Sequence, residues 1–347
     1  MRFLLNKSRG NAVPGYGHGV TAKKKQLWTV PVHLLLALLI FSFCLLCGGC
    51  EQKQGEIDFT STQESSREGS AGIGAEAGGL KGREAPLRIA FASVISPIET
   101  RKSYQKMVDY IAKELGRPAV LVQRKTYEEM NMLLAGGEAD IAFISTGAYT
   151  SYNGMIPLEL LAMVQTDGTV FYKAYFIVNA DSNITTFSQL RGRTFAFTDP
   201  LSYSGRLAVD YMLMDEYQTT SEQFFQRCFY TYSHDKSLWA VENKLADGAG
   251  IDSQIYDYAR KHDSRLDEKI RIIGVMKPTP TGPVVMRQDL PPETKQRLQE
   301  IFFHMDENPE MAEAMQQVII DKFVPPQPDA YNELKRKFRQ REGLPES

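Results

Sequence analysis

Apolar residues in the middle of the chain alternate between short continuous runs and runs with helical spacing. The continuous runs Leu87–Phe91, Ala119–Val122 and Ile141–Ile144 predict three strands. Between them, apolar positions recur every three or four residues over residues 104–115 and over Tyr127–Ala135, which predicts two helices. Strands that alternate with helices favour a mostly parallel sheet flanked by helices.

The same alternation repeats after Asp181, which predicts a second α/β lobe. Its expected elements are, in order, strand Thr194–Phe197, helix Arg206–Tyr217, strand Phe229–Ser233, helix Lys236–Leu245 and a short strand near Gly250 and Ile251. Two apolar segments bordered by polar or Pro-rich sequence, Tyr175–Asn179 and Ile270–Val275, are the expected crossings between the lobes. From Pro291 onward the pattern predicts mainly helices, at Pro292–Phe303, Glu310–Ile320 and Asp329–Arg339.

The N-terminal part has the features of an export signal. Three basic residues at Lys23–Lys25 precede the apolar stretch Leu34–Leu46 and then the tetrapeptide Cys47-Gly48-Gly49-Cys50, an order typical of a secretory signal peptide. A cysteine after Gly-Gly also resembles the lipobox of bacterial lipoproteins, in which Cys50 would be lipidated. An uncleaved signal anchor is the alternative.

These patterns predict five segments. Residues 51–86 hold seven Gly and four Ser without apolar periodicity, as expected of a flexible tether. We therefore expect a signal peptide over 1–49, a lipidated Cys50 with its tether over 50–86, the first part of lobe 1 over 87–180, lobe 2 over 181–270, and a return to lobe 1 with C-terminal helices over 271–347.

Composition and charge narrow the functional classes. With 43% hydrophobic and 24% charged residues, the chain is typical of a globular protein. Six of the 40 basic residues lie in residues 1–49, which hold no Asp or Glu, so the rest carries 34 basic against 42 acidic residues and a net charge of −8. This balance argues against nucleic-acid binding. After Cys50 only Cys228 remains, so no internal disulfide is expected.

The most informative local motif is the junction between a predicted strand and the helix that follows it. After Phe197 the chain reads Thr-Asp-Pro-Leu-Ser-Tyr-Ser-Gly, so two hydroxyls, Ser202 and Ser204, precede an amphipathic helix. Ligands of open α/β sheets bind at this end of the strands, and backbone N–H groups at a helix start attract anions. The junction therefore predicts an oxyanion site, with a simple Ser N-cap as the alternative.

The sequence motifs give little support for a catalytic or metal-binding function. The segment Ser202-Tyr203-Ser204-Gly205 lacks the leading Gly of a nucleophile elbow. The spacing of His, Cys and acidic residues matches no zinc, calcium or Walker-type motif, so neither a metal nor another cofactor is expected.

The Asp-Pro-x-Ser-x-Ser-Gly segment resembles the binding loop of the phosphate, phosphite and phosphonate-binding proteins of ABC importers. Further stretches match that family in order over most of residues 87–300: Leu87-Arg88-Ile89-Ala90 with Ser96-Pro97, Tyr127-Glu128-Glu129, Gly137-Glu138-Ala139-Asp140-Ile141-Ala142, Ile177-Val178-Asn179-Ala180-Asp181-Ser182, Leu190-Arg191-Gly192, Ser233-His234-Asp235 and Gly250-Ile251-Asp252-Ser253. The resemblance implies a two-lobed periplasmic-binding-protein fold of the type II kind, joined by two crossing strands, with the ligand in the cleft.

The resemblance also implies roles for individual residues. Ser202, Tyr203 and Ser204, followed by Gly205, would hold the oxyanion, and His234 would donate a further hydrogen bond. In that family, aromatic residues line the first-lobe side of the cleft, and Tyr127 and Tyr172 fall at those positions. Ser145 and Thr146 follow a predicted strand, where a cleft loop is also expected from the strand order. Ordinary capping or core roles are the alternatives at Tyr127, Ser145, Thr146 and His234.

Asp252 falls at the same predicted cleft with a charge that repels an anion. A carboxylate only accepts hydrogen bonds, so it would favour a ligand that carries its own proton, such as hydrogenphosphate, over sulfate. A ligand amine would satisfy Asp252 equally well, and helix capping is the structural alternative.

The sequence therefore predicts a non-enzymatic, monomeric solute-binding lipoprotein, located in the periplasm or on the cell exterior. Its lobes would close over a phosphorus oxyanion and deliver it to ABC permease and ATPase subunits. A sensor that signals to a partner is one alternative, and the same fold around an aromatic or cationic organic solute is another.

Overall fold

The structure is a computed structural model that describes residues 85–92 and 97–345. The predicted signal peptide, the lipid on Cys50 and most of the predicted tether fall outside the described residues. Within them, no helix is both long and apolar enough to cross a membrane.

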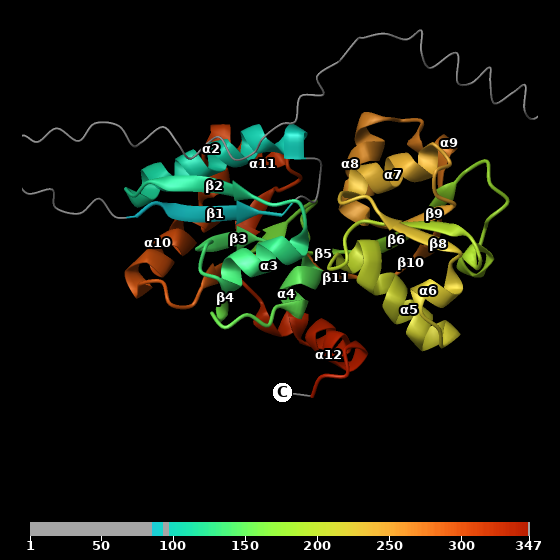
Figure 1. Ribbon diagram of the computed structural model, residues 1–347. Helices are drawn as coiled ribbons and strands as arrows, with labels where there is room; N and C mark the ends of the chain where they lie inside the picture. The colour runs from blue at the N-terminus through green and yellow to red at the C-terminus, as the bar shows by residue number, and fades with distance from the viewer. Residues whose placement is uncertain (1–84, 93–96, 346–347) are drawn as a thin grey trace, which may run out of the picture. The chain divides into compact units, whose positions relative to one another are not determined.

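The first lobe is built on a sheet with strand order β13-β4-β12-β3-β1-β2 (Figure 1). Strands β1, β2 and β3 run parallel, whereas β12 pairs antiparallel with both β3 and β4. The strands are β1 (Leu87–Phe91), β2 (Ala119–Gln123), β3 (Ile141–Phe143), β4 (Leu158–Gln165), β12 (Pro283–Arg287) and β13 (Lys322–Val324).

Helices cover both faces of this sheet, because an inner strand such as β1 is apolar on both sides. Leu87, Ile89 and Phe91 of β1 pack into one core with the helices α2, α10 and α11, whereas Ala90 and Ala92 pack into a second core with α3 and α4. The elements on these faces are α2 (Pro97–Leu115), α3 (Tyr127–Ala135), α4 (Thr146–Ser151), α10 (Pro292–Phe303), the short turn η3 (Met305–Glu307) and α11 (Pro309–Gln316).

The second lobe has a sheet with strand order β10-β6-β9-β7-β8, in which β9, β7 and β8 are parallel. Its strands are β6 (Ala174–Asn179), β7 (Thr194–Phe197), β8 (Arg227–Tyr230), β9 (Gly248–Asp252) and β10 (Ile270–Val275). Its helical elements are η1 (Phe187–Leu190), η2 (Tyr203–Leu207), α5 (Ala208–Tyr217), α6 (Ser221–Phe224), α7 (His234–Glu242), α8 (Ser253–His262) and α9 (Leu266–Lys269). Helices again pack on both faces, in two further apolar clusters.

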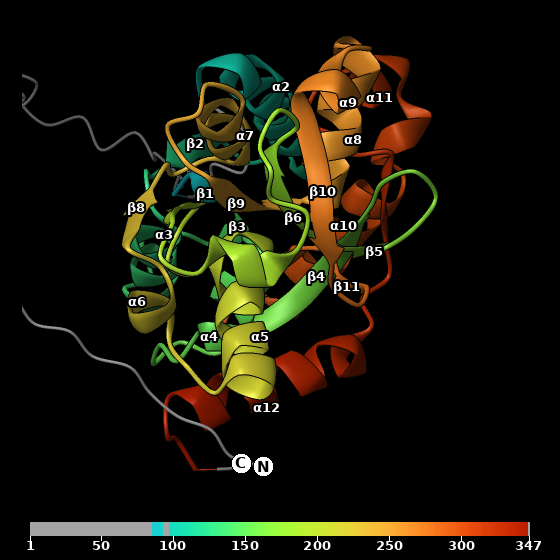
Figure 2. The same cartoon turned by 90° about the vertical axis from the view of Figure 1, so that its right-hand side faces the viewer.

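The crossings between the lobes are not the segments that the sequence predicts. Tyr175–Asn179 lies in β6 and Ile270–Val275 is β10, and both strands belong to the sheet of the second lobe. The chain passes from the first lobe to the second through β5 (Phe171–Tyr172), just before β6, and returns through β11 (Thr279–Pro280), just after β10. These two strands pair antiparallel and lie together in Figure 2. Each crossing strand spans two residues, too few to give an apolar run.

Three other predicted elements begin or end elsewhere in the structure, and a left-handed residue or an irregular turn lies at each difference. Strand β8 ends at Tyr230 instead of Ser233, and Tyr232 just beyond it has φ 61°. Helix α11 ends at Gln316 instead of Ile320, and Ile319 has φ 62°. The predicted helix from Arg206 begins with a π-helical turn, η2, before the regular helix α5.

The C-terminal helix α12 (Asn332–Arg341), preceded by η4 (Pro328–Tyr331), contacts both lobes. The Tyr331 hydroxyl donates to the carbonyl of Thr281 at 2.8 Å, and Leu334 packs in one apolar cluster with Tyr203 and Tyr211 of the second lobe. Arg341 forms an ion pair with Asp210 at 3.0 Å. Helix α12 thus adds a contact between the lobes beside the two crossing strands.

Candidate ligand-binding site

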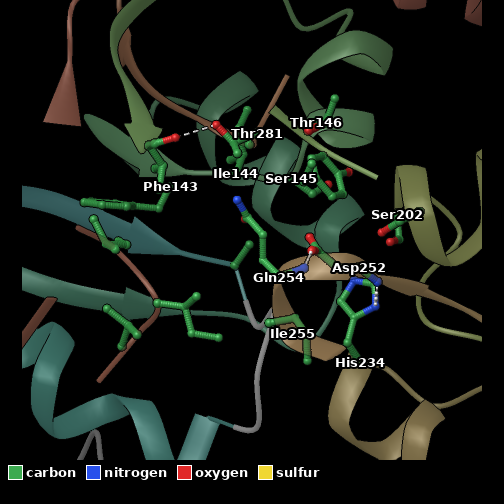
Figure 3. A pocket seen from close by; sticks show the side chains of 18 of the residues that line it. Phe143, Ile144, Ser145, Thr146, Ser202, His234, Asp252, Gln254, Ile255 and Thr281 are labelled. Carbon is green, nitrogen blue, oxygen red and sulfur yellow. Dashed lines mark hydrogen bonds between the residues drawn. The ribbon is translucent and has the colours of Figure 1, made fainter. Parts of the chain in front are cut away.

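A cavity of about 110 Å³ lies between the two lobes, at the ends of strands from both sheets (Figure 3). Its polar lining residues are Tyr104, Tyr127, Ser145, Thr146, Tyr172, Ser202, Ser204, His234, Asp252, Gln254 and Thr281. Eight of the ten residues expected at the ligand from the sequence lie on this lining. The other two, Tyr203 and Gly205, do not line it.

Ser202 and Ser204 reach the cavity through the turn that joins β7 to α5. The Ser202 hydroxyl accepts from the backbone N–H of Gly205 at 3.1 Å, so its own proton can be donated elsewhere. A Cβ at Gly205 would overlap the side chain of Thr198, which explains why glycine stands in this tight turn. The two hydroxyls are nearly fully buried and stand at the start of the η2–α5 helical segment.

Tyr203 lies between these two serines and points elsewhere. Its ring lies 6.3 Å from that of Tyr172 and packs in an apolar cluster with Leu207 and Leu334. The irregular π-helical turn changes the spacing of side chains, so neighbours in sequence face different surroundings.

His234 is the first residue of α7 and is held in one orientation by the second lobe. Its Nδ1 atom accepts the backbone N–H of Asp252 at 3.2 Å and lies 3.2 Å from the Thr198 hydroxyl. Burial lowers the pKa of His234 to about 3, so the ring is neutral at physiological pH. Because Nδ1 is the acceptor, the ring proton resides on Nε2, where it serves as a fixed hydrogen-bond donor.

Asp252 caps helix α8, as the structural alternative predicts, and it also lines the cavity. Its Oδ1 atom accepts the backbone N–H of Gln254 at 2.7 Å. Burial raises the pKa of Asp252 to about 7, so its carboxyl group exchanges a proton near neutral pH. Among the described residues that line the cavity, Asp252 is the one acidic group, and no Lys or Arg is present.

The hydroxyls of the first lobe are already committed to protein partners. Ser145 caps α4, where its hydroxyl accepts from the N–H of Ala148 at 3.1 Å and donates to the carbonyl of Leu201 at 3.3 Å. The Thr146 hydroxyl donates to the carbonyl of Pro280 at 2.8 Å. Both residues shape the cavity wall, and their hydrogen bonds join α4 to the second lobe at Leu201 and to the crossing strand β11 at Pro280.

Two tyrosines complete the polar wall. Burial raises the pKa of Tyr172 well above its ordinary value, against the opposing effect of hydrogen bonds with Thr146 and Ser204. Tyr172 thus joins a residue of the first lobe to one of the second. Tyr127 begins α3, and its phenol remains protonated because burial raises its pKa as well.

Direct contacts between the lobes surround the cavity. The backbone N–H of Tyr127 donates to Asp199 Oδ2 at 3.1 Å, across from one lobe to the other. A Cβ at Gly147 would overlap the carbonyl oxygen of Leu201, so this glycine permits the close approach of α4 to the second lobe. The described conformation is therefore one in which the lobes touch beside the cavity.

Gln254 and Thr281 are polar lining residues that sequence reasoning missed. The Thr281 hydroxyl donates to the carbonyl of Val164 at 2.7 Å, whereas the Gln254 side-chain nitrogen is buried and has no partner among the described residues. Gln254 stands two positions after Asp252, in the first turn of α8, and this closeness is the one signal that could have drawn attention to it.

A profile of the family described as ABC transporter, phosphonate, periplasmic substrate-binding protein matches residues 89–331. The chain belongs to this family. Members of the phosphonate-binding family are solute-binding components of transporters, and the family is not one of enzymes. Among the described residues, no group of three or more His, Cys, Asp or Glu residues gathers as a metal site would require.

Individual relatives agree with the family assignment. A phosphonates-binding periplasmic protein of Escherichia coli is 26% identical over 162 residues, which cover 46% of this chain and 46% of the relative. The match therefore spans about half of that relative's length.

Solved structures of this family share the fold. A protein of Prochlorococcus marinus in complex with methylphosphonate has a TM-score of 0.67 at 15% identity, over 74% of this chain and 98% of the other. A binding protein component of an ABC phosphonate transporter from Pseudomonas aeruginosa has a TM-score of 0.66 at 21% identity, over 74% of this chain and 88% of the other. These likenesses establish a two-lobed binding-protein fold.

Proposed function

We propose that this protein captures a phosphonate or a related phosphorus oxyanion between its lobes and delivers it to an ABC permease with its ATPase. The carrying observation is that the starts of the η2–α5 segment, α7 and α8 all line one cavity, with Ser202, Ser204 and His234 among the lining residues. Helix starts carry positive partial charge, and those of their N–H groups that no cap accepts suit an oxyanion in a site whose described lining residues include no Lys or Arg.

In this proposal, Ser202 and Ser204 donate from their hydroxyls and His234 donates from Nε2. The head group would occupy the second-lobe side of the cavity, and Tyr127 and Tyr172 would close it from the other side with Ser145 and Thr146. Tyr203 and Gly205 act indirectly, since they shape the binding turn without lining the cavity.

Asp252 determines which anions are accepted. Because the pKa of Asp252 is about 7, its carboxyl group and a bound anion must share one proton at neutral pH. A hydrogenphosphonate supplies that proton itself, whereas sulfate does not at neutral pH, so Asp252 favours the phosphorus compound. This proton also avoids two negative charges in direct contact.

The cellular setting follows from the same proposal. Export by the N-terminal signal, lipidation at Cys50 and a tether over residues 51–86 would hold the binding lobes outside the cytoplasmic membrane, close to the permease. The protein would act as a monomer, because each chain contributes both lobes of its own cavity.

Calorimetric titration tests the proposal directly. After unfolding and refolding to remove bound solutes, the protein is titrated with phosphate, phosphite, methylphosphonate and sulfate at neutral pH. We expect binding of at least one phosphorus compound and much weaker binding of sulfate. The absence of both heat and thermal stabilisation with every phosphorus compound would overturn the ligand class and leave the fold assignment intact.

A further inference from the structure

The cavity extends beyond the region that an oxyanion head group needs. On the first-lobe side its lining includes aromatic and aliphatic side chains from α2, β3, β4, the end of β1 and the segment before β13, among them Tyr104, Phe143, Val164, Val318, Ile319 and Ile320. Figure 3 shows Gln254 between Phe143 on one side and Ser202 with His234 on the other. The cavity thus has a polar end and an apolar end.

The described residues at the apolar end offer no oppositely charged partner to a charged group. The Thr281 hydroxyl at its border is committed to the carbonyl of Val164, and burial raises the pKa of the Tyr104 phenol, which is hydrogen-bonded to Thr100. No charged side chain among the described lining residues lies there, since Asp252 belongs to the polar end with His234 (Figure 3). An ammonium group placed at this end would lose its hydration without a counter-charge among the described lining residues. The apolar wall favours a hydrocarbon group over water.

Gln254 marks the boundary between the two ends. Its backbone N–H is fixed on Asp252 Oδ1 at 2.7 Å, and its side-chain nitrogen is buried without a partner among the described residues. A buried amide donor without an acceptor is costly, and native proteins rarely leave one unless a ligand or water completes it. The position suits a hydrogen bond to an oxygen of the ligand's head group.

Ile319 supplies a second observation at the apolar wall. Its φ of 62° is left-handed, a conformation that glycine or asparagine adopts with little strain and that a β-branched residue adopts rarely. An isoleucine at such a strained position, on the lining of the cavity, points to a role for its side chain there.

From these observations we propose that the cavity contains a second subsite, which takes an apolar substituent on phosphorus. The ligand is then an alkylphosphonate, with its head group at the polar end, its hydrocarbon group against Phe143, Val164 and Ile319, and a hydrogen bond from Gln254 to the head group. This inference rests on the proposed function and adds the class of substituent to it.

A matched pair of ligands tests the subsite. Propylphosphonate and 2-aminoethylphosphonate have the same shape and differ by a methyl in place of an ammonium, and methylphosphonate serves as the short reference. In calorimetric titration we expect propylphosphonate to bind about tenfold more tightly than methylphosphonate, because two additional methylene groups are buried. The affinity for propylphosphonate should exceed that for 2-aminoethylphosphonate by a larger factor.

The outcomes separate the two proposals. Equal affinity for propylphosphonate and methylphosphonate, or tighter binding of 2-aminoethylphosphonate, would overturn the apolar subsite and leave phosphonate binding in place. No binding of any of the three would overturn the proposed function itself.

Two variants locate the subsite. Ile319→Gly relieves the left-handed strain and removes the apolar wall, so we expect the preference for propylphosphonate over methylphosphonate to fall toward one while the unfolding temperature is maintained. Gln218→Gly, at another left-handed position with φ 47° outside the cavity lining, is the matched control and should leave the preference unchanged. An unchanged preference in folded Ile319→Gly would contradict the proposed wall.

Gln254→Leu tests the boundary donor separately. It should weaken methylphosphonate and propylphosphonate by the same factor, because the donor serves the common head group. Unchanged affinity for both ligands in a folded variant would exclude that role for Gln254.

Discussion

The two lobes contribute to the cavity in different chemical ways. The second lobe supplies Ser202, Ser204, His234 and Asp252, which stand at helix starts, and His234 has a fixed donor proton. The first lobe supplies an apolar wall, and its hydroxyls at Ser145 and Thr146 donate to carbonyl groups of the protein. The difference suggests that the second lobe holds the head group, whereas the first lobe closes the site and determines what else fits.

A variant that keeps the first lobe from approaching the second should have the largest effect on ligand affinity. Gly147→Ala introduces a Cβ that overlaps the carbonyl of Leu201 in the second lobe. We expect methylphosphonate binding to weaken by about 3 kcal/mol, roughly 100-fold, because the closed arrangement is overpacked. Titration calorimetry measures this change.

Gly136→Ala is the control for that variant, because a Cβ at Gly136 meets nothing nearer than 3.3 Å. It should bind nearly as the unmodified protein does. Normal affinity in Gly147→Ala would show that contact between α4 and the Leu201 turn is not needed for binding.

Removing a hydroxyl from each lobe compares their roles directly. Ser204→Ala should weaken methylphosphonate binding by about 1–3 kcal/mol, because a donor to a charged group is lost. Thr146→Val keeps the shape of a residue whose hydroxyl proton goes to Pro280, so its effect on the dissociation constant should be smaller. Equal losses in the two variants would contradict the division of roles between the lobes.

The pH dependence of binding reports on Asp252. Its pKa of about 7 means that the carboxyl group is protonated below that pH and carries a charge above it, where it repels an anion. Methylphosphonate affinity should therefore fall by about tenfold per pH unit well above pH 7, where one proton must be taken up on binding.

Asp252→Asn removes the titrating group. In this variant the decrease with pH should be smaller, limited to the ligand's own ionisation, and sulfate should bind relatively better. A pH profile identical to that of the unmodified protein would eliminate Asp252 as the group that controls anion choice.

The smallest effect is expected at helix α12, which joins both lobes away from the cavity lining. Arg341→Met breaks the 3.0 Å ion pair with Asp210, whose carboxylate also bonds Arg206 and Ser221. We expect unfolding in urea to show a loss of about 0.5–1 kcal/mol, as is usual for a partly exposed pair. The affinity for methylphosphonate should remain the same, and a large change would indicate that α12 takes part in closure.

Strong local signals in the sequence explain which elements could be predicted. The bounds of β1, α3, β7 and α10 agree with the prediction, because each combines an apolar run or helical periodicity with a clear start or stop. Strands β4, β12 and β13 were missed. Strands β12 and β13 pair antiparallel with strands distant in sequence, and that pairing leaves no local trace.

The cavity lining was predicted where polar residues follow a strand, and missed elsewhere. Ser202, Ser204, His234 and Asp252 stand at helix starts after strands or turns, a position that topology alone places near a ligand. In the sequence, apolar lining residues such as Phe143 and Val164 look like core residues, because hydrophobic periodicity does not distinguish a residue of the core from one that lines a cavity. Gln254 has no charge and no motif, so only the folded chain reveals its unpaired nitrogen.

The three helix starts at the cavity also bear on how this protein could evolve. Their attraction for an anion arises from backbone N–H groups, which no single side-chain substitution removes. Mutations in the first-lobe wall could then change the accepted substituent while affinity for the head group is retained. Gene duplication followed by such changes would yield paralogues with different substrates from one inherited anion site.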